Sequence, residues 1–482
     1  MVLGVVVPDG VGVKNYLYSG FPNIFLQNPE NSILLFCNFL KEDGIQLDDE
    51  SMLKRVSIEP LPNYNESLKL RLLRETICFA RLYHFSHKLK NKTILGAAPR
   101  ANSTAKKIFL KYCALFGKYF SGSYDKILSL ENAYSLALAK SDVSVAADAL
   151  RKNKVDALIS LHQRPVQNIP FYEAARRMEL KRFSIIYSWD NIAKARLFTP
   201  AQVYLLWSRY MKNQMNLFYP EIKDEQMVIT GTPQFSFYTD ESWHTDKASF
   251  CNQYHIDPAK PVVLFSGSDY RTSPFDPELL RDVATTLRSM DEQIRPQLVF
   301  RRSPADFTGR YDKVFENFPE IISIDPIWTN DGDTWTTAIP NKADIRNLKV
   351  LLQLCNVVIN VSSTMALDAA IFDKPCIYMA FNPAEAEAAG FDYLKDIHEE
   401  DHFKVMKDIN AVVYATDINQ LGSLIKTCIE TPGNIAPGRK AYLNSITDNL
   451  SNKAAENLVE AICGYCEFQD SSILEPEYQK QP

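Results

Sequence analysis

Residues 348–370 read LKVLLQLCNVVINVSSTMALDAA, and Asp373-Lys374-Pro375 and Cys376-Ile377-Tyr378-Met379 follow shortly after them. The pattern predicts a helix, a buried strand, a turn rich in hydroxyl groups, a second helix, a short turn and a second strand. The turn brings the hydroxyls of Ser362, Ser363 and Thr364 and several backbone N–H groups to a helix N-terminus, beyond the carboxyl end of a strand. A helix N-terminus at this edge of an α/β sheet favours negative charge, so the stretch predicts a phosphate-binding crevice.

Short apolar runs of the same kind recur along the chain, with helical patterns between them. Continuous Val, Ile and Leu runs suit strands that are buried on both faces, and such strands form parallel sheets. Their alternation with helices predicts two doubly wound α/β domains. The first series of strands is expected at residues 4–7, 33–36, 156–161, 183–187, 203–206 and 227–230, and the second at 262–265, 297–300, 321–324, 357–361, 376–379 and 411–415.

Two domains are expected, because 482 residues exceed what one hydrophobic core usually organises. The boundary falls near Thr230-Gly231-Thr232-Pro233-Gln234, where Gly and Pro follow the last strand of the first series. We therefore expect an N-terminal domain over residues 1–235 and a C-terminal domain over residues 236–444. The helical segment 445–470 is expected to return to the N-terminal domain.

Composition and charge argue against several classes of protein. The net charge of −5 implies no general attraction to nucleic acid, and no stretch reaches the ~18 apolar residues of a membrane span. The N-terminus reads as a first strand, not as a targeting segment, and the nine cysteines form no disulfide framework. Cys463-x-x-Cys466 lacks the second pair that a zinc site needs. We expect a cytoplasmic protein, with at most a peripheral contact to the inner membrane surface.

Residues 66–120 are expected to be helical and to carry a basic, aromatic run. Two interpretations stay open for this run. It is either a helix face exposed to solvent or a patch that binds an acceptor or a membrane surface. Its members are Arg71, Arg74, Arg81, Tyr83, His84, His87, Lys88 and Lys90.

Polar residues follow three predicted strands of the N-terminal domain, so they are expected at one edge of its sheet. Asp9 follows the first strand and is a candidate general base, although Asp before Gly is also typical of a turn. The glycines next to it permit positive φ and the close approach of a ligand. Asp190 is a second candidate base, or else the N-cap of the next helix. The other residues at this edge are Gly10, Gly12, Lys14, His162, Arg164, Trp189 and Asn191.

Three further motifs follow strands of the C-terminal domain. Ser266-Gly267-Ser268 supplies small residues that let a diphosphate approach, and Arg301-Arg302-Ser303-Pro304 supplies two guanidinium groups that favour phosphate or a surface ion pair. Trp328 is expected either to line a pocket for a base or to be structural. Asp331-Gly332-Asp333 is similar to a metal-binding Asp-x-Asp, but its Thr, Asn and Gly neighbours predict a turn.

Four of these motifs together resemble the bacterial surface-polysaccharide glycosyltransferases of the GT-B fold, over most of the chain. The resemblance implies two Rossmann-like doubly wound domains that face each other across a cleft, with the nucleotide sugar held by the C-terminal domain. The hydroxyl turn resembles the Ser-Ser/Thr motif that binds donor phosphate in several such families. The arginine loop resembles an Arg-x-His-Pro loop in which Ser303 replaces the histidine. The motifs are Ser362–Ala370, Arg302-Ser303-Pro304, Gly231–Gln234 and Ser188–Asn191.

The resemblance implies transfer of a sugar from a nucleotide-activated donor to a glycan, lipid-linked or protein acceptor, with inversion favoured and without a metal or other cofactor. Asp9 ranks first as the catalytic base and Asp190 second, and the remaining residues named at their sheet edge form the acceptor side. Two alternatives stay open: transfer of a polyol phosphate on the same scaffold, and an inactive nucleotide-binding scaffold. The expected donor-binding residues are Ser268, Arg301, Arg302, Ser303, Trp328, Ser362, Ser363, Thr364 and Asp368.

Overall fold

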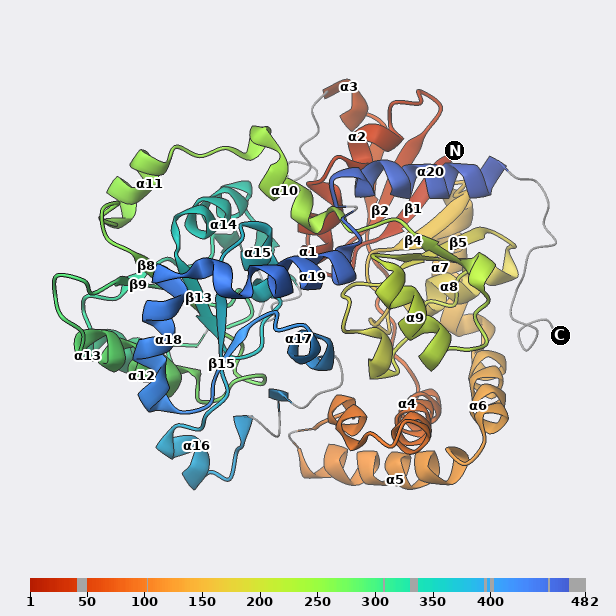
Figure 1. Cartoon of the computed structure of the whole chain (residues 1–482). Coiled ribbons are helices and arrows are strands. Elements are labelled where there is room, and N and C mark those ends of the chain that lie inside the picture. Colours follow the sequence, from red (N-terminus) through yellow and green to blue (C-terminus); the bar gives the residue numbers. More distant parts are fainter. Residues whose placement is uncertain are drawn as a thin grey trace. The chain divides into compact units, whose positions relative to one another are not determined.

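The chain forms two compact units (Figure 1). The computed structural model describes residues 1–40, 50–101, 103–306, 308–329, 337–393, 397–398, 403–449 and 451–467. The first unit comprises Met1–Gln234 together with the C-terminal segment from Ile446, and the second comprises Phe235–Ser445. Each unit is built around its own parallel sheet.

The sheet of the first unit has seven strands in the order β3-β2-β1-β4-β5-β6-β7. All neighbouring strands are parallel, and β1 lies inside the sheet between β2 and β4, with Val5 opposite Leu35 of β2 and Ile159 of β4. Continuous apolar runs form these strands because helices cover both faces of the sheet. The strands are β1 (Val2–Val6), β2 (Ser32–Phe36), β3 (Val56–Glu59), β4 (Ala157–Ser160), β5 (Lys181–Ile185), β6 (Val203–Leu206) and β7 (Met227–Ile229).

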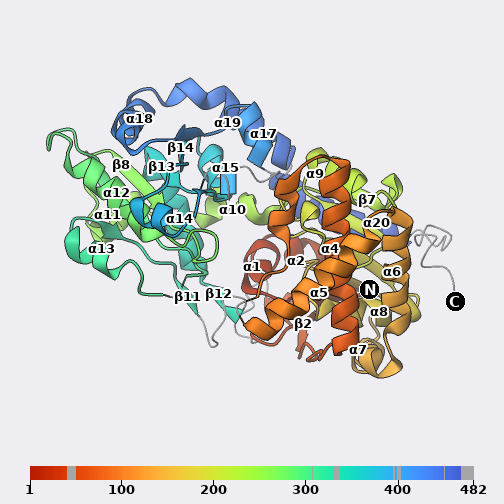
Figure 2. The same ribbon diagram turned by 90° about the horizontal axis from the view of Figure 1, so that it is seen from below.

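Four helices are inserted between β3 and β4 of the first unit, and the longest of them is α4 (Figure 2). Ser67 caps α4 by accepting a hydrogen bond from the backbone N–H of Leu70, and Ser103 caps α5 in the same way through Lys106. These helices are α4 (Leu68–Lys88), α5 (Thr104–Phe120), α6 (Tyr124–Ala137) and α7 (Lys140–Lys152). The other helical elements of the unit are α1 (Gly10–Gly12), the π-helical η1 (Val13–Leu17), α2 (Phe21–Phe25), α3 (Glu50–Leu53), η3 (Lys92–Ala97), α8 (Asn168–Arg177), η4 (Ile192–Lys194), α9 (Arg209–Phe218), η5 (Asp224–Gln226), η12 (Ser451–Lys453) and α20 (Ala454–Glu467).

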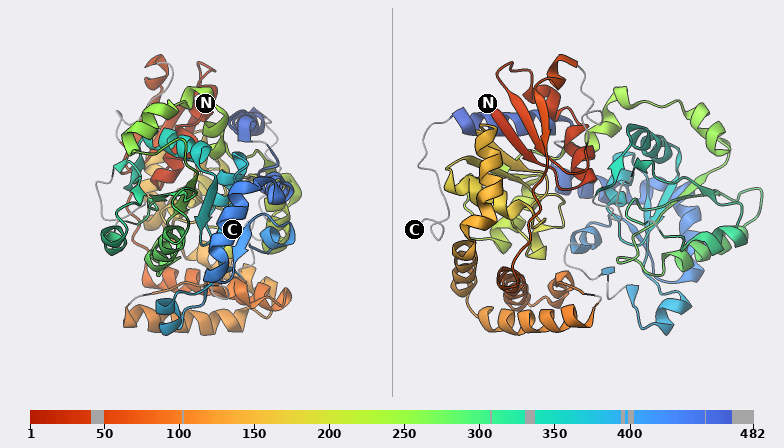
Figure 3. Two further views of the ribbon diagram at one scale, coloured as in Figure 1. Left: turned by 60° about the vertical axis from the view of Figure 1, so that its left-hand side comes forward. Right: turned by 180° about the vertical axis from the view of Figure 1, so that it is seen from behind.

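The C-terminal helix α20 belongs to the first unit (Figure 3). It packs against α2, and the side-chain amide of Asn457 donates a hydrogen bond of 3.1 Å to the backbone carbonyl of Thr230. The ring of Tyr465 on α20 meets the ring of Phe183 on β5 edge to face, with centroids 5.7 Å apart. The last described helix therefore covers the N-terminal sheet.

The sheet of the second unit has six strands in the order β10-β9-β8-β13-β14-β15, all parallel. They are β8 (Val262–Ser266), β9 (Gln297–Arg301), β10 (Ile322–Ser323), β13 (Val357–Asn360), β14 (Cys376–Met379) and β15 (Val413–Ala415), and β11 (Trp328–Thr329) and β12 (Ile339–Pro340) form a small antiparallel pair. The described helical elements within this unit are α10 (Ser236–Thr239), η7 (Glu241–Trp243), α11 (Lys247–Tyr254), α12 (Asp276–Arg288), α13 (Asp312–Asn317), α14 (Lys342–Leu354), α15 (Met365–Ile371), α16 (Ala384–Ala388), α17 (Lys404–Asp408), α18 (Ile418–Glu430) and η11 (Pro432–Ile435). The elements η6 (Pro233–Phe235) and α19 (Ala436–Thr447) each span a boundary between the two units.

The predicted fold class, two doubly wound α/β domains, is confirmed by these sheets. Every predicted strand overlaps an observed one, but β3 was not expected. Its sequence VSIE is only partly buried and mixes polar with apolar residues, so it carries a weak signal for a strand at the edge of a sheet.

Two members of the predicted basic run are not on the surface. Arg81 is buried and forms ion pairs with Glu131 at 2.6 Å and Glu221 at 2.7 Å. Arg74 is buried and is paired with Glu66, whose carboxylate it contacts at 2.8 Å. Neither open interpretation of the run holds for these two arginines, because each neutralises buried carboxylates inside the unit.

Candidate functional site

The first unit has a topological switch point between β1 and β4. The strand order leads from β1 to β2 and β3 on one side, and from β4 to β5, β6 and β7 on the other. Doubly wound sheets bind ligands beyond the carboxyl ends of the strands at such a point. The segment after β1 carries Asp9, and the segment after β4 carries His162.

Asp9 and His162 contact each other directly at this switch point. Oδ2 of Asp9 lies 2.7 Å from Nδ1 of His162, and Oδ1 accepts a hydrogen bond of 2.9 Å from the backbone N–H of Gly12. Asp9 is 1% exposed and His162 is 8% exposed. An ionised carboxylate can only accept hydrogen bonds, so Nδ1 is the nitrogen that donates to Asp9, and in the neutral form of the imidazole Nε2 then carries the free lone pair.

The imidazole of His162 is stacked on the ring of Tyr187, with centroids 4.0 Å apart and planes 18° from parallel. Burial, followed by the charges of Asp9 and Asp190, raises the pKa of Tyr187 far above its usual value, so this phenol stays neutral. Within the described part of the chain, Nε2 of His162 is buried and has no hydrogen-bond partner. Such an atom costs roughly 1–3 kcal/mol of stability. A neutral Nε2 whose ring is held by a carboxylate is the arrangement of a general base.

The glycines beside Asp9 do not have the positive φ that the sequence analysis allowed for. Gly12 has φ −58° and ψ −40°, in the ordinary helical region, and Gly10 is not among the described glycines with positive φ. A Cβ on Gly12 would lie 3.3 Å from Cβ of Leu161. The glycine therefore allows α1 to pack closely on the segment after β4, which brings Asp9 within reach of His162. Lys14 follows on η1 and is half-buried.

Two further predicted residues of the first unit are brought together. Nη1 of Arg164 donates a hydrogen bond of 2.8 Å to Oδ1 of Asn191. Burial, followed by the nearby Arg196, lowers the pKa of Arg164. Trp189, two residues before Asn191 in the sequence, is buried and 2% exposed.

Asp190 has a different partner. Its carboxylate forms an ion pair with Lys194, one helical turn later. The expectation that Asp190 caps the next helix is wrong, because η4 begins after Asn191. A carboxylate held by a lysine is a weaker candidate for a base than the neutral nitrogen of His162.

The second unit has its switch point between β8 and β13, where the strand order again turns both ways. Ser268 follows β8, and its backbone N–H donates a hydrogen bond of 2.9 Å to Oδ2 of Asp276. A Cβ on Gly267 would lie 3.1 Å from the hydroxyl of Tyr311 and 3.2 Å from the ring of Phe300. The small residue is thus required by the packing of the unit itself.

The hydroxyl turn after β13 lies at the same switch point. Its backbone is fixed by a hydrogen bond of 3.1 Å from the N–H of Ser363 to Oδ1 of Asn360 and by one of 2.8 Å from the hydroxyl of Tyr378 to the carbonyl of Ser363. Oγ of Ser363 accepts from the N–H of Met365 at 3.2 Å, at the start of α15. Ser362 is half-buried and Thr364 is exposed.

Arg301 is the centre of a buried network in the second unit. It is 4% exposed, and its Nη2 contacts both carboxylate oxygens of Asp344 at 2.9 Å. Asp344 also accepts hydrogen bonds of 2.9 Å from the backbone N–H of Ile327 and from the indole Nε1 of Trp328. The arginine charge lowers the pKa of Asp344 against the opposing effect of burial. Arg301 and Trp328 are therefore tied together by Asp344.

The other predicted donor-binding residues lie around this network. Nη1 of Arg302 donates to the carbonyl of Thr308 at 2.7 Å, and its Nε lies 3.3 Å from Asp325. Asp368 accepts a hydrogen bond from the hydroxyl of Tyr238. Oγ of Ser303 accepts from the N–H of Ala305 at 3.3 Å. Asp331 and Asp333 lie outside the described residues.

The sequence analysis did not single out Tyr187, Asp344 or Tyr238. Tyr187 directly follows a predicted strand, so its place at the sheet edge was available as a signal. Asp344 lies in the first turn of α14, where an acidic residue is expected from the helix dipole alone. Its contact with Arg301, 43 residues earlier, left no signal in the sequence.

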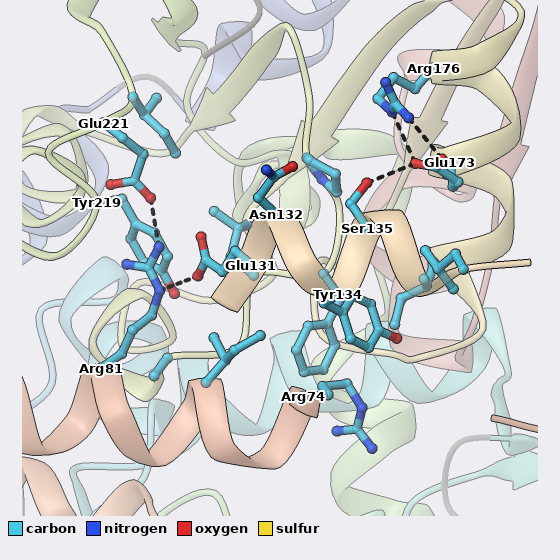
Figure 4. A pocket seen from close by; sticks show the side chains of 18 of the residues that line it. Arg74, Arg81, Glu131, Asn132, Tyr134, Ser135, Glu173, Arg176, Tyr219 and Glu221 are labelled. Carbon is cyan, nitrogen blue, oxygen red and sulfur yellow. Dashed lines mark hydrogen bonds and ion pairs between the residues drawn. The ribbon is translucent and has the colours of Figure 1, made fainter. Parts of the chain in front are cut away.

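A cavity of about 130 Å³ lies apart from these residues in the first unit (Figure 4). Arg81 reaches Glu131 and Glu221 along one wall, and Arg176 and Ser135 point toward Glu173 along another. The charged groups of its walls are paired with one another. None of the predicted site residues lines it.

Two observations concern metal binding and membrane crossing within the described ranges. No group of three or more His, Cys, Asp or Glu side chains there is placed to hold a metal ion. None of the helices in these ranges combines the length and apolar character needed to cross a bilayer.

No protein-family model and no curated protein matches the sequence. Solved structures do match. An S. aureus MnaA co-structure with UDP is 11% identical, with a TM-score of 0.51 and coverage of 96% of each chain. A putative UDP-N-acetylglucosamine 2-epimerase from Listeria monocytogenes is 9% identical, with a TM-score of 0.51 and coverage of 98% of each chain.

A UDP-GlcNAc 2-epimerase from Neisseria meningitidis, bound to UDP-GlcNAc, is 11% identical with a TM-score of 0.50, over 96% of this chain and 99% of that one. At such low identity the likeness concerns the fold. The chain shares with these proteins a fold of two Rossmann-like α/β domains, of the GT-B type.

Proposed function

We propose that the protein is a nucleotide-sugar-dependent glycosyltransferase in which His162 is the catalytic base and Asp9 positions it. The observation that carries this proposal is the Asp9–His162 pair at the switch point of the first sheet, with Nε2 of His162 buried and unpartnered within the described residues. The proposal moves the role of base from Asp9, the first choice from sequence, to its neighbour.

The geometry explains why the histidine suits this role better than the aspartate. Both oxygens of Asp9 are engaged, one by Gly12 and one by His162. Nε2 has a free lone pair, and a proton taken up there creates an imidazolium next to the carboxylate of Asp9. The carboxylate stabilises that charge and fixes the tautomer, as in a Ser-His-Asp triad. Stacking on the ring of Tyr187 holds the imidazole of His162 in its orientation.

The reaction we propose is a single displacement at the anomeric carbon. The acceptor hydroxyl oxygen forms a bond to the anomeric carbon while the bond from that carbon to the donor phosphate oxygen breaks. The hydroxyl proton passes to Nε2 of His162, and the nucleotide leaves with the negative charge. One displacement inverts the anomeric configuration, and the reaction requires no electron transfer and no cofactor.

The second unit supplies the groups for the donor in this proposal. The hydroxyls of Ser362, Ser363 and Thr364 lie beyond the carboxyl end of β13, and the hydroxyl of Ser268 lies beyond that of β8. Donors at a sheet switch point favour phosphate and stabilise the charge of the leaving group. Arg302 is the cation we assign to the phosphate, because Arg301 is buried and its Nη2 is held by Asp344.

Epimerisation of a nucleotide sugar is the second candidate, because the solved structures with TM-scores of 0.50–0.51 include UDP-GlcNAc 2-epimerases. A histidine base can also take a proton from carbon. The two reactions differ in what leaves: transfer frees the nucleotide, whereas epimerisation can return the intact nucleotide sugar with one stereocentre changed.

A panel of nucleotides tests these candidates. Thermal shift with UDP, GDP, CDP and CMP identifies the nucleobase of the donor, because a ligand that binds the folded protein raises the Tm of the protein. The corresponding nucleotide sugars, and CDP-polyols, are then incubated with the wild type and with His162→Gln, and products are read by NMR. We expect free nucleotide from a nucleotide sugar in the wild type only. An epimer of the intact donor favours the second candidate, nucleotide release from CDP-polyols favours polyol-phosphate transfer, and binding without turnover contradicts all three.

A further inference from the structure

The helix α5 is the outermost element of the helical insertion in the first unit, with α4 between it and the sheet (Figures 1 and 3). It packs on α4 through a narrow strip. Cys113 and Gly117 are its only fully buried residues, and a Cβ on Gly117 would lie 2.5 Å from Cβ of Phe79 on α4. One face of α5 is thus held tightly, and the opposite face is turned away from the unit.

That opposite face is apolar and exposed. Ile108 is 50% exposed, Tyr112 58%, Leu115 66% and Tyr119 70%. These positions are spaced by four, three and four residues, so at 3.6 residues per turn they form one continuous stripe along the helix. Phe116, 49% exposed, widens the stripe. Exposed apolar side chains that are gathered in this way mark an interaction surface.

The charge on the helix has one sign. Thr104–Phe120 contains four lysines and no acidic residue, in a chain whose net charge is −5. Lys107, Lys111 and Lys118 are exposed and, by their spacing, lie along one border of the apolar stripe. The ammonium of Lys126 on α6 lies 5.5 Å from the ring centre of Tyr119, which adds a further positive charge at the end of the stripe.

We propose that α5 is a membrane-docking helix that lies in the headgroup region of an anionic lipid bilayer. Its apolar stripe enters the boundary between headgroups and acyl chains, and the lysines at its border contact the acidic headgroups. An apolar stripe with aromatic residues, bordered by lysines, is the pattern of helices that lie in a membrane interface. The proposal concerns residues other than the Asp9–His162 pair and does not rest on the proposed function.

Charge favours a lipid surface over a second copy of this chain. Pairing two α5 helices through this face would place the lysines of both helices in one interface without acidic partners on either helix. An anionic bilayer instead offers negative charge along the border and an apolar interior beneath the stripe. Salt should weaken binding to an anionic bilayer, because it screens the attraction between the lysines and the headgroups.

Co-sedimentation of the full-length protein with lipid vesicles tests the proposal. Vesicles of phosphatidylcholine alone are compared with vesicles of phosphatidylcholine and phosphatidylglycerol, at low and high NaCl. We expect binding to the anionic vesicles only, weakened by salt. The variant Lys107→Glu/Lys111→Glu should bind them about tenfold or more weakly, since each lysine near an anionic surface contributes measurably. The variant Leu115→Gln/Tyr119→Gln should also lose binding.

Matched control variants lie in the second unit. Ile294 is 61% exposed, close to the exposure of Leu115, and Lys260 is an exposed lysine outside the helices. Ile294→Gln and Lys260→Glu should leave vesicle binding unchanged, and thermal melts of all variants verify the fold. Equal binding to both vesicle types, or binding to neither, overturns the proposal. It is also overturned if sedimentation equilibrium shows a dimer that Leu115→Gln/Tyr119→Gln dissociates, because the stripe is then covered by a second copy.

Discussion

His162 and Asp9 are two buried residues whose contact fixes the position of one reactive atom, Nε2 of His162. Asp9 is fixed by the N–H of Gly12, and it in turn fixes the ring of His162. Hydrogen bonds on one nitrogen of a histidine decide what the other nitrogen can do. The Arg301–Asp344 pair shows the opposite use of buried charge, because every described contact of that carboxylate organises the fold around Trp328.

Alanine variants of the two adjacent arginines at the end of β9 should therefore differ in stability. Arg301→Ala leaves Asp344 buried without its cation, and breaking a buried pair costs about 3–5 kcal/mol. Arg302→Ala removes a partly exposed side chain and should cost less than about 1 kcal/mol. Urea unfolding measures both. Donor affinity should fall about tenfold in Arg302→Ala, as expected for a lost charge-assisted hydrogen bond. Equal stability of the two variants would contradict the structural role of Arg301.

Asp276 should make the stability of the second unit depend on pH. Burial raises its pKa from 3.8 to about 6, although hydrogen bonds from Ser268 and Tyr311 oppose the shift. Because the folded pKa is raised, the stabilising contribution of the protonated form is full below pH ~4 and is lost as the pH rises through ~6, by about 3 kcal/mol. Asp276→Asn stays neutral. Its Tm relative to the wild type should rise between pH 4 and pH 7, and a difference that is constant with pH would rule out this titration.

At the scale of the elements, the close contact between α4 and α5 requires a glycine at position 117. A Cβ there meets Cβ of Phe79 at 2.5 Å and the backbone nitrogen of Ala80 at 2.9 Å, so neither neighbour can rotate away. Gly117→Ala should destabilise the protein by about 1–3 kcal/mol through overpacking.

Gly464 on α20 is the matched control for this prediction, because a Cβ there meets nothing within 4 Å. Gly464→Ala should be neutral or stabilise by up to about 1 kcal/mol, as alanine favours a helix over glycine. Thermal unfolding of both variants measures the difference. Equal shifts in Tm would mean that α5 is not held on α4 by this contact.

The strands could be predicted from sequence because buried parallel strands are continuous apolar runs. β6 and β14 match their predicted ranges in full. The edge strand β3 and the short pair β11 and β12 escaped prediction, since two to four partly exposed residues give no such run. The apolar stripe of α5 escaped for another reason: a sequence shows that a helix face is apolar, but only the packing shows that this face is exposed.

The placement of Asp9 and His162 at one edge of the sheet could be predicted from the sequence, but the contact between them could not. Residues that follow strands reach the same sheet edge by topology, so Asp9 and His162 were both expected there. Their hydrogen bond joins residues 153 positions apart and depends on Gly12 packing against Leu161, which no local pattern encodes. For the same reason the partner of Arg301 was unforeseen.

At the scale of the whole molecule, each unit repeats one principle. A parallel sheet reverses its strand order once, and small or polar residues gather beyond that point, Asp9 and His162 in the first unit and Ser268 and Ser362–Thr364 in the second. Proteins that share the fold at 9–11% identity show that the scaffold tolerates almost complete replacement of its sequence. Function must therefore be argued from the side chains of this chain.

The most direct test of the account is the steady-state turnover of a nucleotide-sugar donor by the wild type, Asp9→Asn, His162→Gln and the double variant, with Asp190→Asn as control. We predict that each single change at the pair lowers kcat by roughly 10²–10⁴. The double variant should be no slower than His162→Gln alone, because residues that act as a unit are not additive. Donor binding should persist throughout, and Asp190→Asn should remain close to the wild type. A His162→Gln enzyme that turns over at the wild-type rate would contradict the account.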